Sequence, residues 1–330
     1  QTITNDGNSD LKPDFLWFKN RNETVSHTLW DSTRGITKFL VADSTASEYT
    51  NASGYELTSF NTDGFGLGAH NNAGINQSSS YNYVAWQWKA NGGTTTAFNE
   101  SGSNPGGTRQ TNTDAGFSII SYTGTGSNGT IAHGLPSTPE FLIFKRRDAT
   151  QFWCVWQQAI GDDYKLALQS TDALDSDGAF MNSTLPTSTN ITVGGASVNT
   201  NADNGTYICY AFSPVQGYSK FGSYVGNGNA NGTFVYTGFK PAWVMTKRTD
   251  GTSGWFIQDI KRGIRNSSSG TALEANSNLA ESGIGATNYD IDFLSNGFKL
   301  RQSNVYLNAS GGTYIYMAFA ENPFTTSTGI

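Results

Sequence analysis

The sequence predicts an all-β protein made of tandem antiparallel β-sandwich repeats, jelly-roll or lectin-like in kind, in three units. Short runs of aromatic and β-branched residues alternate with Gly, Asn, Ser and Thr along all 330 residues, a pattern typical of strands joined by turns. No long segment shows the 3.6-residue period of a helix. Related phrases also return three times at a nearly constant spacing, which indicates structural units in tandem.

The first repeated phrase is a proline, one intervening residue, a four-residue apolar run and a lysine. Its prolines are Pro13, Pro139 and Pro241, and its lysines are Lys19, Lys145 and Lys247. A proline fixes φ and withholds an N–H, so it marks the entry of a strand and not its middle. Both faces of each run are apolar. We therefore expect a central strand that is covered on both sides.

A second phrase, near the end of each unit, begins with a tyrosine and alternates aromatic residues on one face. It occupies residues 83–88, 207–212 and 314–319, and its tyrosine follows the proline of the first phrase by 70, 68 and 73 residues. The strict period of two predicts a strand. We expect the aromatic face to be the inner face of each sandwich.

These anchors divide the chain into repeats. We predict a first repeat over 1–90, a linker rich in Gly, Ser, Thr and Asn over 91–115, a second repeat over 116–217 and a third over 218–330. The long linker suggests that the first repeat is more independent, whereas the short join near residue 215 suggests that the other two pack closely.

Repeats two and three open with a further strand, at 117–126 and 220–228, which has no counterpart at the start of repeat one. Either this strand lies upstream of Gln1, or another segment or chain supplies it. An open strand position is a natural place for pairing with a partner, because it presents unpaired backbone groups.

Composition excludes several classes of protein. Charged residues make up 14% of the chain and the net charge is −6, which argues against a nucleic-acid surface. No apolar run approaches the ~18 residues of a membrane helix. The low lysine content and the abundance of Asn and Thr favour an extracellular or particle-surface location. Cys154 and Cys209 are expected to be buried free thiols, with a disulfide between them as the alternative.

Catalytic and metal-binding patterns are not found. The histidines His27, His70 and His133 lack zinc-ligand spacing, and no nucleophile elbow, phosphate loop or dinucleotide fingerprint occurs. Asp-Gly turns at 175–178 and 203–205 do not fit a calcium loop. We therefore predict no catalytic residue, no metal and no cofactor, and a protein that is not an enzyme.

One charged pair occurs twice. Asp31 and Arg34 return as Asp259 and Arg262, so we interpret them as a carboxylate–guanidinium pair that fixes a turn. A binding or interface role for Asp31, Arg34 and the neighbouring Trp30 is the alternative.

Glu48 and its counterpart Glu281 have no repeated second carboxylate, as a glycosidase would need. Four loop tyrosines could stack on sugars or pack at interfaces: Tyr49, Tyr55, Tyr81 and Tyr289.

Four long phrases, at 12–21, 27–35, 218–228 and 312–321, resemble an uncharacterised repeat domain of tailed bacteriophages that is frequent in marine phages. The resemblance covers nearly the whole chain. It implies a virion structural or tail-fibre protein, and it offers no active-site residues to carry over.

We therefore expect a non-enzymatic phage virion surface protein, namely a fibre, tail-tip or head-decoration component that displays loops for host attachment or subunit contacts. Its expected partners are other virion proteins, a host-surface glycan and further copies of itself. The alternatives are a secreted carbohydrate-binding lectin or adhesin and, third, a polysaccharide-degrading enzyme.

Overall fold

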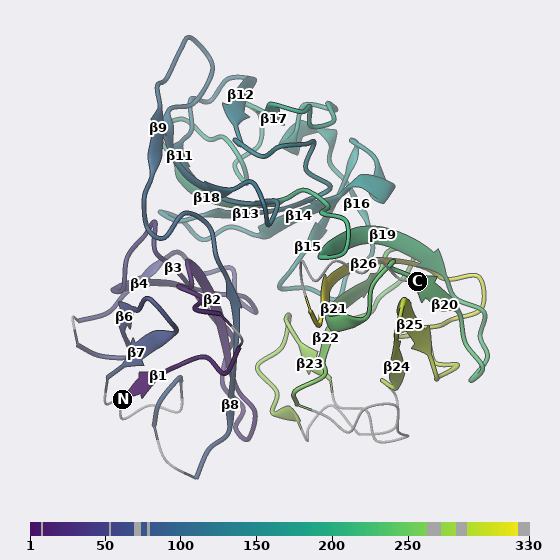
Figure 1. The fold of residues 1–330 in the computed structure, drawn as a ribbon. Coiled ribbons are helices and arrows are strands. Elements are labelled where there is room, and N and C mark those ends of the chain that lie inside the picture. Colours follow the sequence, from purple (N-terminus) through teal and green to yellow (C-terminus); the bar gives the residue numbers. More distant parts are fainter. Residues whose placement is uncertain are drawn as a thin grey trace.

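The computed structural model describes residues 1–7, 9–52, 54–68, 74–77, 80–262, 272–281 and 289–322. Within these ranges the chain forms three large and three small sheets, and every strand pair is antiparallel (Figure 1). Two short 3₁₀ helices, η1 (Gln158–Ile160) and η2 (Gly178–Phe180), are the described helical segments. The all-β prediction is confirmed.

The large sheets share one strand order. The first runs β5 (Tyr49–Thr50), β4 (Lys38–Val41), β3 (Thr28–Asp31), β2 (Phe15–Asn20), β8 (Tyr83–Trp88). The second runs β16 (Asp175–Ser176), β15 (Tyr164–Ala167), β14 (Trp153–Gln157), β13 (Phe141–Arg146), β18 (Thr206–Phe212), β11 (Phe117–Thr123), β10 (Gly107–Asn112), β9 (Thr96–Phe98). The third runs β23 (Leu273–Glu274), β22 (Trp255–Asp259), β21 (Pro241–Arg248), β26 (Thr313–Ala320), β19 (Ser219–Val225).

Each large sheet carries a small sheet on its outer face (Figure 1). The small sheets are β1 (Thr2–Ile3) with β7 (Phe65–Leu67) and β6 (Leu57–Phe60), then β12 (Gly129–Ala132) with β17 (Asn190–Val193), then β20 (Phe234–Tyr236) with β25 (Gly297–Leu300) and β24 (Ile291–Leu294). In the first sandwich Leu16 and Phe18 of β2 pack with Phe65 and Leu67 of β7 in one buried cluster. The predicted sandwich architecture is therefore present.

The predicted apolar runs form β2, β13 and β21, and the three lysines that end them are fully buried. Their pairing with the tyrosine-containing strands has the same register in each sheet, with the partners Phe15 and Trp88, Phe141 and Phe212, and Trp243 and Phe319. Whether each sandwich is a separately folding repeat stays a prediction.

The prediction of a linker over 91–115 is wrong, because this segment contains strands. It contains β9 and β10, and β10 pairs with β11 along six residues, from Gly107 opposite Tyr122 to Asn112 opposite Phe117. Most of β10 is only half-buried. Because most of this strand is partly open to solvent, polar Thr, Arg and Asn side chains can occupy it, and the strand forms without a repeating apolar pattern.

The aromatic faces expected inside each sandwich instead face one another at the centre of the molecule. Phe15 stacks on Tyr210 with ring centroids 4.3 Å apart, and Trp88 lies 5.7 Å from Trp243 and 5.6 Å from Phe319. These residues belong to one buried cluster to which all three large sheets contribute. The expected independence of the first repeat is therefore wrong, because its aromatic face is covered by the other two sheets.

Candidate functional site

Asp31, at the end of β3, and Arg34 form a buried turn. Asp31 Oδ1 accepts the backbone N–H of Arg34 at 2.9 Å, and Oδ2 accepts Arg34 Nε at 2.5 Å. Gly35 completes the turn with φ of +86°, a left-handed conformation that costs glycine little. The Asp31 and Arg34 side chains are 0% exposed, so neither can contact an external ligand.

The same pair joins the first large sheet to the second. Tyr210 of β18 donates its hydroxyl to Asp31 Oδ2 at 2.8 Å and lies 3.1 Å from Arg34 Nη2. Glu48 lies 3.3 Å from Arg34 Nη1 and accepts Arg147 Nε at 2.8 Å. Burial lowers the pKa of Arg34, but Asp31, Tyr210 and Glu48 more than offset this and raise the pKa above its ordinary value. The guanidinium therefore stays charged inside the protein.

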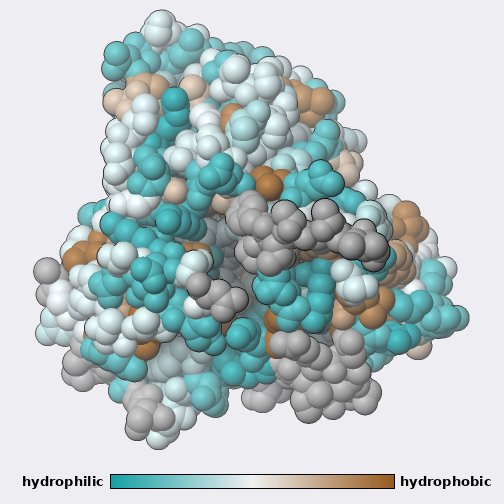
Figure 2. Space-filling view, viewed as in Figure 1, coloured by the Kyte–Doolittle hydropathy of each residue, from teal (hydrophilic) through white to brown (hydrophobic). Residues whose placement is uncertain are grey.

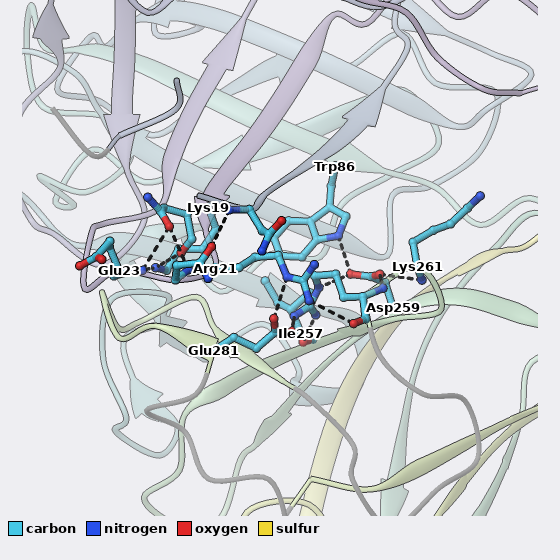
Figure 3. A network of polar contacts seen from close by, with 12 residues as sticks. Lys19, Arg21, Glu23, Trp86, Ile257, Asp259, Lys261 and Glu281 are labelled. Atoms are coloured by element: carbon cyan, nitrogen blue, oxygen red, sulfur yellow. Dashed lines mark hydrogen bonds and ion pairs between the residues drawn. The ribbon is translucent and has the colours of Figure 1, made fainter. Parts of the chain in front are cut away.

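A matching network joins the first sheet to the third (Figure 3). Trp86 of β8 donates its indole N–H to Asp259 Oδ2 at 3.0 Å, and the Arg262 guanidinium lies over the Trp86 ring at 5.4 Å. Glu281 accepts Arg262 Nη1 and Arg21 Nε, both at 2.7 Å. Asp259 Oδ1 also accepts the backbone N–H of Arg262 at 3.0 Å, so this pair holds a turn and forms part of a junction.

The third junction, between the second and third sheets, uses uncharged residues. Gln157 and Ile160 stand where the other two junctions have Asp and Arg, and Met317 has the strand register of Tyr210 and Trp86. The backbone geometry is nevertheless the same. The N–H of Leu174 donates to the carbonyl of Thr249 at 2.9 Å.

The corresponding backbone bonds at the polar junctions run from Glu48 N to Arg147 O at 2.8 Å and from Glu281 N to Arg21 O at 2.9 Å. One junction therefore occurs three times with two kinds of side-chain chemistry. Glu48 shares Arg34 with Asp31, and Glu281 shares Arg262 with Asp259, so arginines engage the carboxylates at both polar junctions.

Two of the repeated lysines also cross junctions. Lys145 Nζ donates to the carbonyls of Thr45 at 3.0 Å and Gln151 at 2.7 Å, and Lys247 Nζ donates to Thr171 O at 3.1 Å. Burial lowers the pKa of Lys19, Lys145 and Lys247 to about 8. Backbone carbonyls, and not carboxylates, receive these ammonium groups, which is a structural use of lysine.

Indole groups bridge the same junctions. Trp153 Nε1 donates to Val41 O and Trp255 Nε1 donates to Ala167 O, both at 2.9 Å. His27 has the equivalent position in the first sheet, and its Nδ1 accepts Trp17 Nε1 at 2.9 Å. Burial, Lys19 and Arg262 lower the pKa of His27 well below its ordinary value. His27 is therefore a neutral packing residue.

The remaining candidates are dispersed. Trp30 is buried and stacks on Phe39, which stacks on Tyr49, with centroids 4.8 and 5.1 Å apart. Tyr49 is 43% exposed and Tyr55 is 50% exposed, as a ligand-binding role would require. Tyr289 is buried against Phe256, and burial raises its pKa to about 12. The structure thus places Tyr289 in a core.

Tyr81 lines a groove of about 540 Å³ beside β8, between the first large sheet and its small sheet. The groove is also lined by Gln1, Ile3, Phe18, Phe65, Leu67, Ile75, Asn76, Tyr83, Ala85 and Gln87. Ile75 and Asn76 were not predicted to be site residues. Asn76 begins one of many Asn-x-Ser/Thr sequons, and both residues lie shortly before the repeated tyrosine, Tyr83.

Other sequence candidates have structural roles. Asp175 and Asp177 both bind Lys165, and no cluster of three or more metal-ligating residues occurs among the residues that the structure describes. His70 lies outside the described residues. Cys154 and Cys209 are buried free thiols, as expected. They flank Phe144 on neighbouring strands, which separates their backbones by about 10 Å, too far for a disulfide.

None of the described helices is long and apolar enough to cross a membrane. Comparison with curated proteins and with solved structures gave no match. A family model described as a domain of unknown function, DUF7483, matches residues 1–323. Because this match spans nearly the whole chain, the chain belongs to the DUF7483 family.

Proposed function

We propose that this chain is a non-enzymatic structural protein of a phage particle surface, namely a fibre, tail-tip or head-decoration component. The observation that carries the proposal is the use of the repeated polar residues. Asp31, Arg34, Asp259, Arg262 and Glu281 are all engaged in joining one large sheet to another. Buried charged residues that join the large sheets make the protein a rigid body, and a rigid body is suited to displaying loops and to forming subunit contacts.

The surface supports the same proposal. Figure 2 shows a face on which hydrophilic and neutral residues predominate and hydrophobic residues appear in small separate groups. The large aromatic side chains are gathered at the centre, where Trp17, Trp153 and Trp255 are at most 2% exposed. The small sheets and their loops face outward (Figure 1). These outward loops are the parts that we propose to contact a host surface or neighbouring subunits.

The test is the location of the chain. Mass spectrometry of density-purified phage particles, with antibody labelling under the electron microscope, should find the chain in stoichiometric amount on the particle surface. Size-exclusion chromatography with light scattering measures the proposed self-association. Absence from purified particles would overturn the particle-surface role.

Carbohydrate binding is the second candidate, favoured by the exposed Tyr49 and Tyr55. A flat exposed ring is suited to stacking on a sugar face, and Tyr49 is supported from below by Phe39 and Trp30. A glycan array separates this role from a purely structural one. Binding that is lost in Tyr49→Ala but kept in Phe152→Ala, a control at another exposed aromatic residue, would support the lectin.

A further inference from the structure

We propose that the groove beside β8 is an acceptor for one extended peptide strand, supplied from outside residues 1–330, that carries the motif Ser-Tyr-x-Gly-x-Gly. The proposal rests on the fold alone, so its failure would leave the proposed surface role untouched.

The free edge of β8 is the first observation. In the second and third large sheets, β18 and β26 each pair on one side with the apolar strand and on the other with β11 or β19. Their counterpart β8 pairs only with β2 among the described strands. An edge with unpaired N–H and C=O groups is a template for a further strand.

The orientation of the free groups follows from the register. Arg21 N donates to Asn82 O, and residues in an antiparallel pair alternate between facing their partner and facing away. The backbone groups of Tyr83, Ala85 and Gln87 therefore point to the open side. The equivalent residues of β18, Tyr207, Cys209 and Ala211, pair with β11.

The occupied slots show what side chain belongs there. Tyr122 of β11 stacks on Tyr207 at 5.1 Å, and Tyr224 of β19 stacks on Tyr314 at 4.9 Å. Tyr83 has the same register as Tyr207 and Tyr314, and it faces the groove. The groove therefore lies where a tyrosine from a neighbouring strand would sit.

The acceptor for that tyrosine is also present. Tyr122 donates its hydroxyl to Thr200 O at 2.6 Å, and Tyr224 donates to Leu307 O at 2.9 Å. In each case the residue two positions later donates its N–H to the tyrosine of the paired strand, from Ala202 and Ala309.

In the first sandwich the donor to the Tyr83 hydroxyl is Gln77 N, at 3.0 Å. Two positions earlier lies Ile75, which lines the groove. Its carbonyl is thus the predicted acceptor for the hydroxyl of the incoming tyrosine.

A buried asparagine accepts a backbone N–H from the segment that follows the strand in each of the two occupied positions. Asn201 and Asn308 are fully buried, and their Oδ1 atoms accept the N–H groups of Thr125 and Asn227, both at 2.9 Å. Each donor lies three residues after the strand tyrosine. Asn76 has the equivalent position in the first sandwich and lines the groove. Its Oδ1 should accept the corresponding N–H of the incoming strand.

The motif follows from these two templates. Ser121–Gly126 and Ser223–Gly228 both have the sequence Ser-Tyr-x-Gly-x-Gly. The first glycine is required by close approach, since a Cβ on Gly124 would lie 2.3 Å from Ala202 O and one on Gly226 would lie 2.2 Å from Ala309 O. Both copies of the motif are already paired inside their own sheets. Neither strand is therefore free to act as the donor, in the same copy or in a folded second copy, and the motif occurs nowhere else in residues 1–330.

The test uses the whole chain and a labelled synthetic peptide with the sequence of residues 117–128, measured by fluorescence anisotropy. Saturable binding with one peptide per chain is expected. Replacing the peptide tyrosine by serine removes a ring stack and a hydrogen bond, which should weaken binding about tenfold or more. A valine at the first motif glycine should abolish binding.

A matched pair of protein variants locates the site. Ala85→Pro removes an outward N–H and places a ring in the path of the partner strand, whereas proline is tolerated at a free strand edge. Ala85→Ser keeps the N–H. Binding should be lost in Ala85→Pro and kept in Ala85→Ser. Circular dichroism checks that both variants remain folded. If Ala85→Pro does not fold, Tyr83→Leu takes its place as the test variant. Tyr83→Leu removes the stacking partner but no backbone group, and it should weaken binding.

Four results would overturn the proposal. The first is no binding at the solubility limit of the peptide, and the second is equal binding of a scrambled peptide. The third is equal binding by the wild type and by both groove variants, Ala85→Pro and Tyr83→Leu. The fourth is a concentration-dependent homodimer that the peptide dissociates, because a second copy would then be the occupant. An oligosaccharide that displaces the peptide and binds in its place would assign the groove to a sugar.

Discussion

Removing one charge from the Asp31–Arg34 junction should destabilise the protein far more than removing a surface charge. In Asp31→Gln the Arg34 guanidinium, whose side chain is 0% exposed, keeps only Glu48 at 3.3 Å as a carboxylate partner. Leaving a buried charge without its partner costs about 3–5 kcal/mol. Because Glu48 remains, we expect a loss near the lower end, about 3 kcal/mol. Arg34→Ile leaves the buried Asp31 carboxylate without its arginine partner and should lower the free energy of unfolding by a similar amount.

The chain itself supplies the compensating change. Gln157 and Ile160 occupy these two positions at the uncharged junction, so the double variant Asp31→Gln, Arg34→Ile replaces both charges with residues that the fold already uses. It should lose less than the sum of the single variants, with a coupling free energy of about 3 kcal/mol. The recovery is partial because the Tyr210 hydroxyl loses both of its side-chain partners.

The assay is chemical unfolding followed by tryptophan fluorescence, with the four proteins forming a double-mutant cycle. Asp6→Asn is the control, since the Asp6–Lys261 pair is 90% and 74% exposed and should leave the unfolding midpoint unchanged. Additive single variants, or an Asp31→Gln loss no larger than that of the control, would refute the claim that this pair is a buried junction.

Three further predictions concern the junctions and the core. Cys154 and Cys209 are fully buried, and burial raises the pKa of both thiols; a thiol reagent should modify neither in the native protein and both after denaturation, and rapid native labelling would contradict their placement. The pKa of Lys145 is lowered by burial to about 8 from 10.5; the unfolded chain therefore binds more protons between these values, so the stability of wild type relative to Lys145→Met should rise from pH 8 to about 10.5, and a constant difference would argue against it. Trp255→Phe removes one of two donors to the half-buried carbonyl of Ala167, which also accepts the N–H of Ser170 at 3.2 Å, and should cost about 0.5–1.5 kcal/mol in a denaturant titration, whereas an unchanged midpoint would show that this contact does not hold the junction.

Local strand structure was predictable from the sequence because it depends on residues that are neighbours along the chain. The prolines before β2 and β13, the proline that opens β21 and the four-residue apolar runs predict buried strands, and these strands are buried on both faces. The Asp31–Arg34 turn was likewise predictable, since its two residues lie three positions apart.

The partners of these elements could not be predicted. A period of two shows which residues share a face but not which sheet covers that face. The aromatic faces of β8, β18 and β26 were therefore assigned to the insides of sandwiches, although they meet at the centre of the molecule. Tyr210 lies 179 residues from Asp31, and no local signal connects them. The strand β10 escaped prediction because its half-buried polar residues give no apolar period.

The central claim is that three large sheets share one aromatic centre and fold as one body. Differential scanning calorimetry tests it most directly. A shared centre predicts one transition whose calorimetric enthalpy equals its van't Hoff enthalpy. Two or three separable transitions, or a calorimetric enthalpy well above the van't Hoff value, would show that the sandwiches unfold independently and would contradict the account.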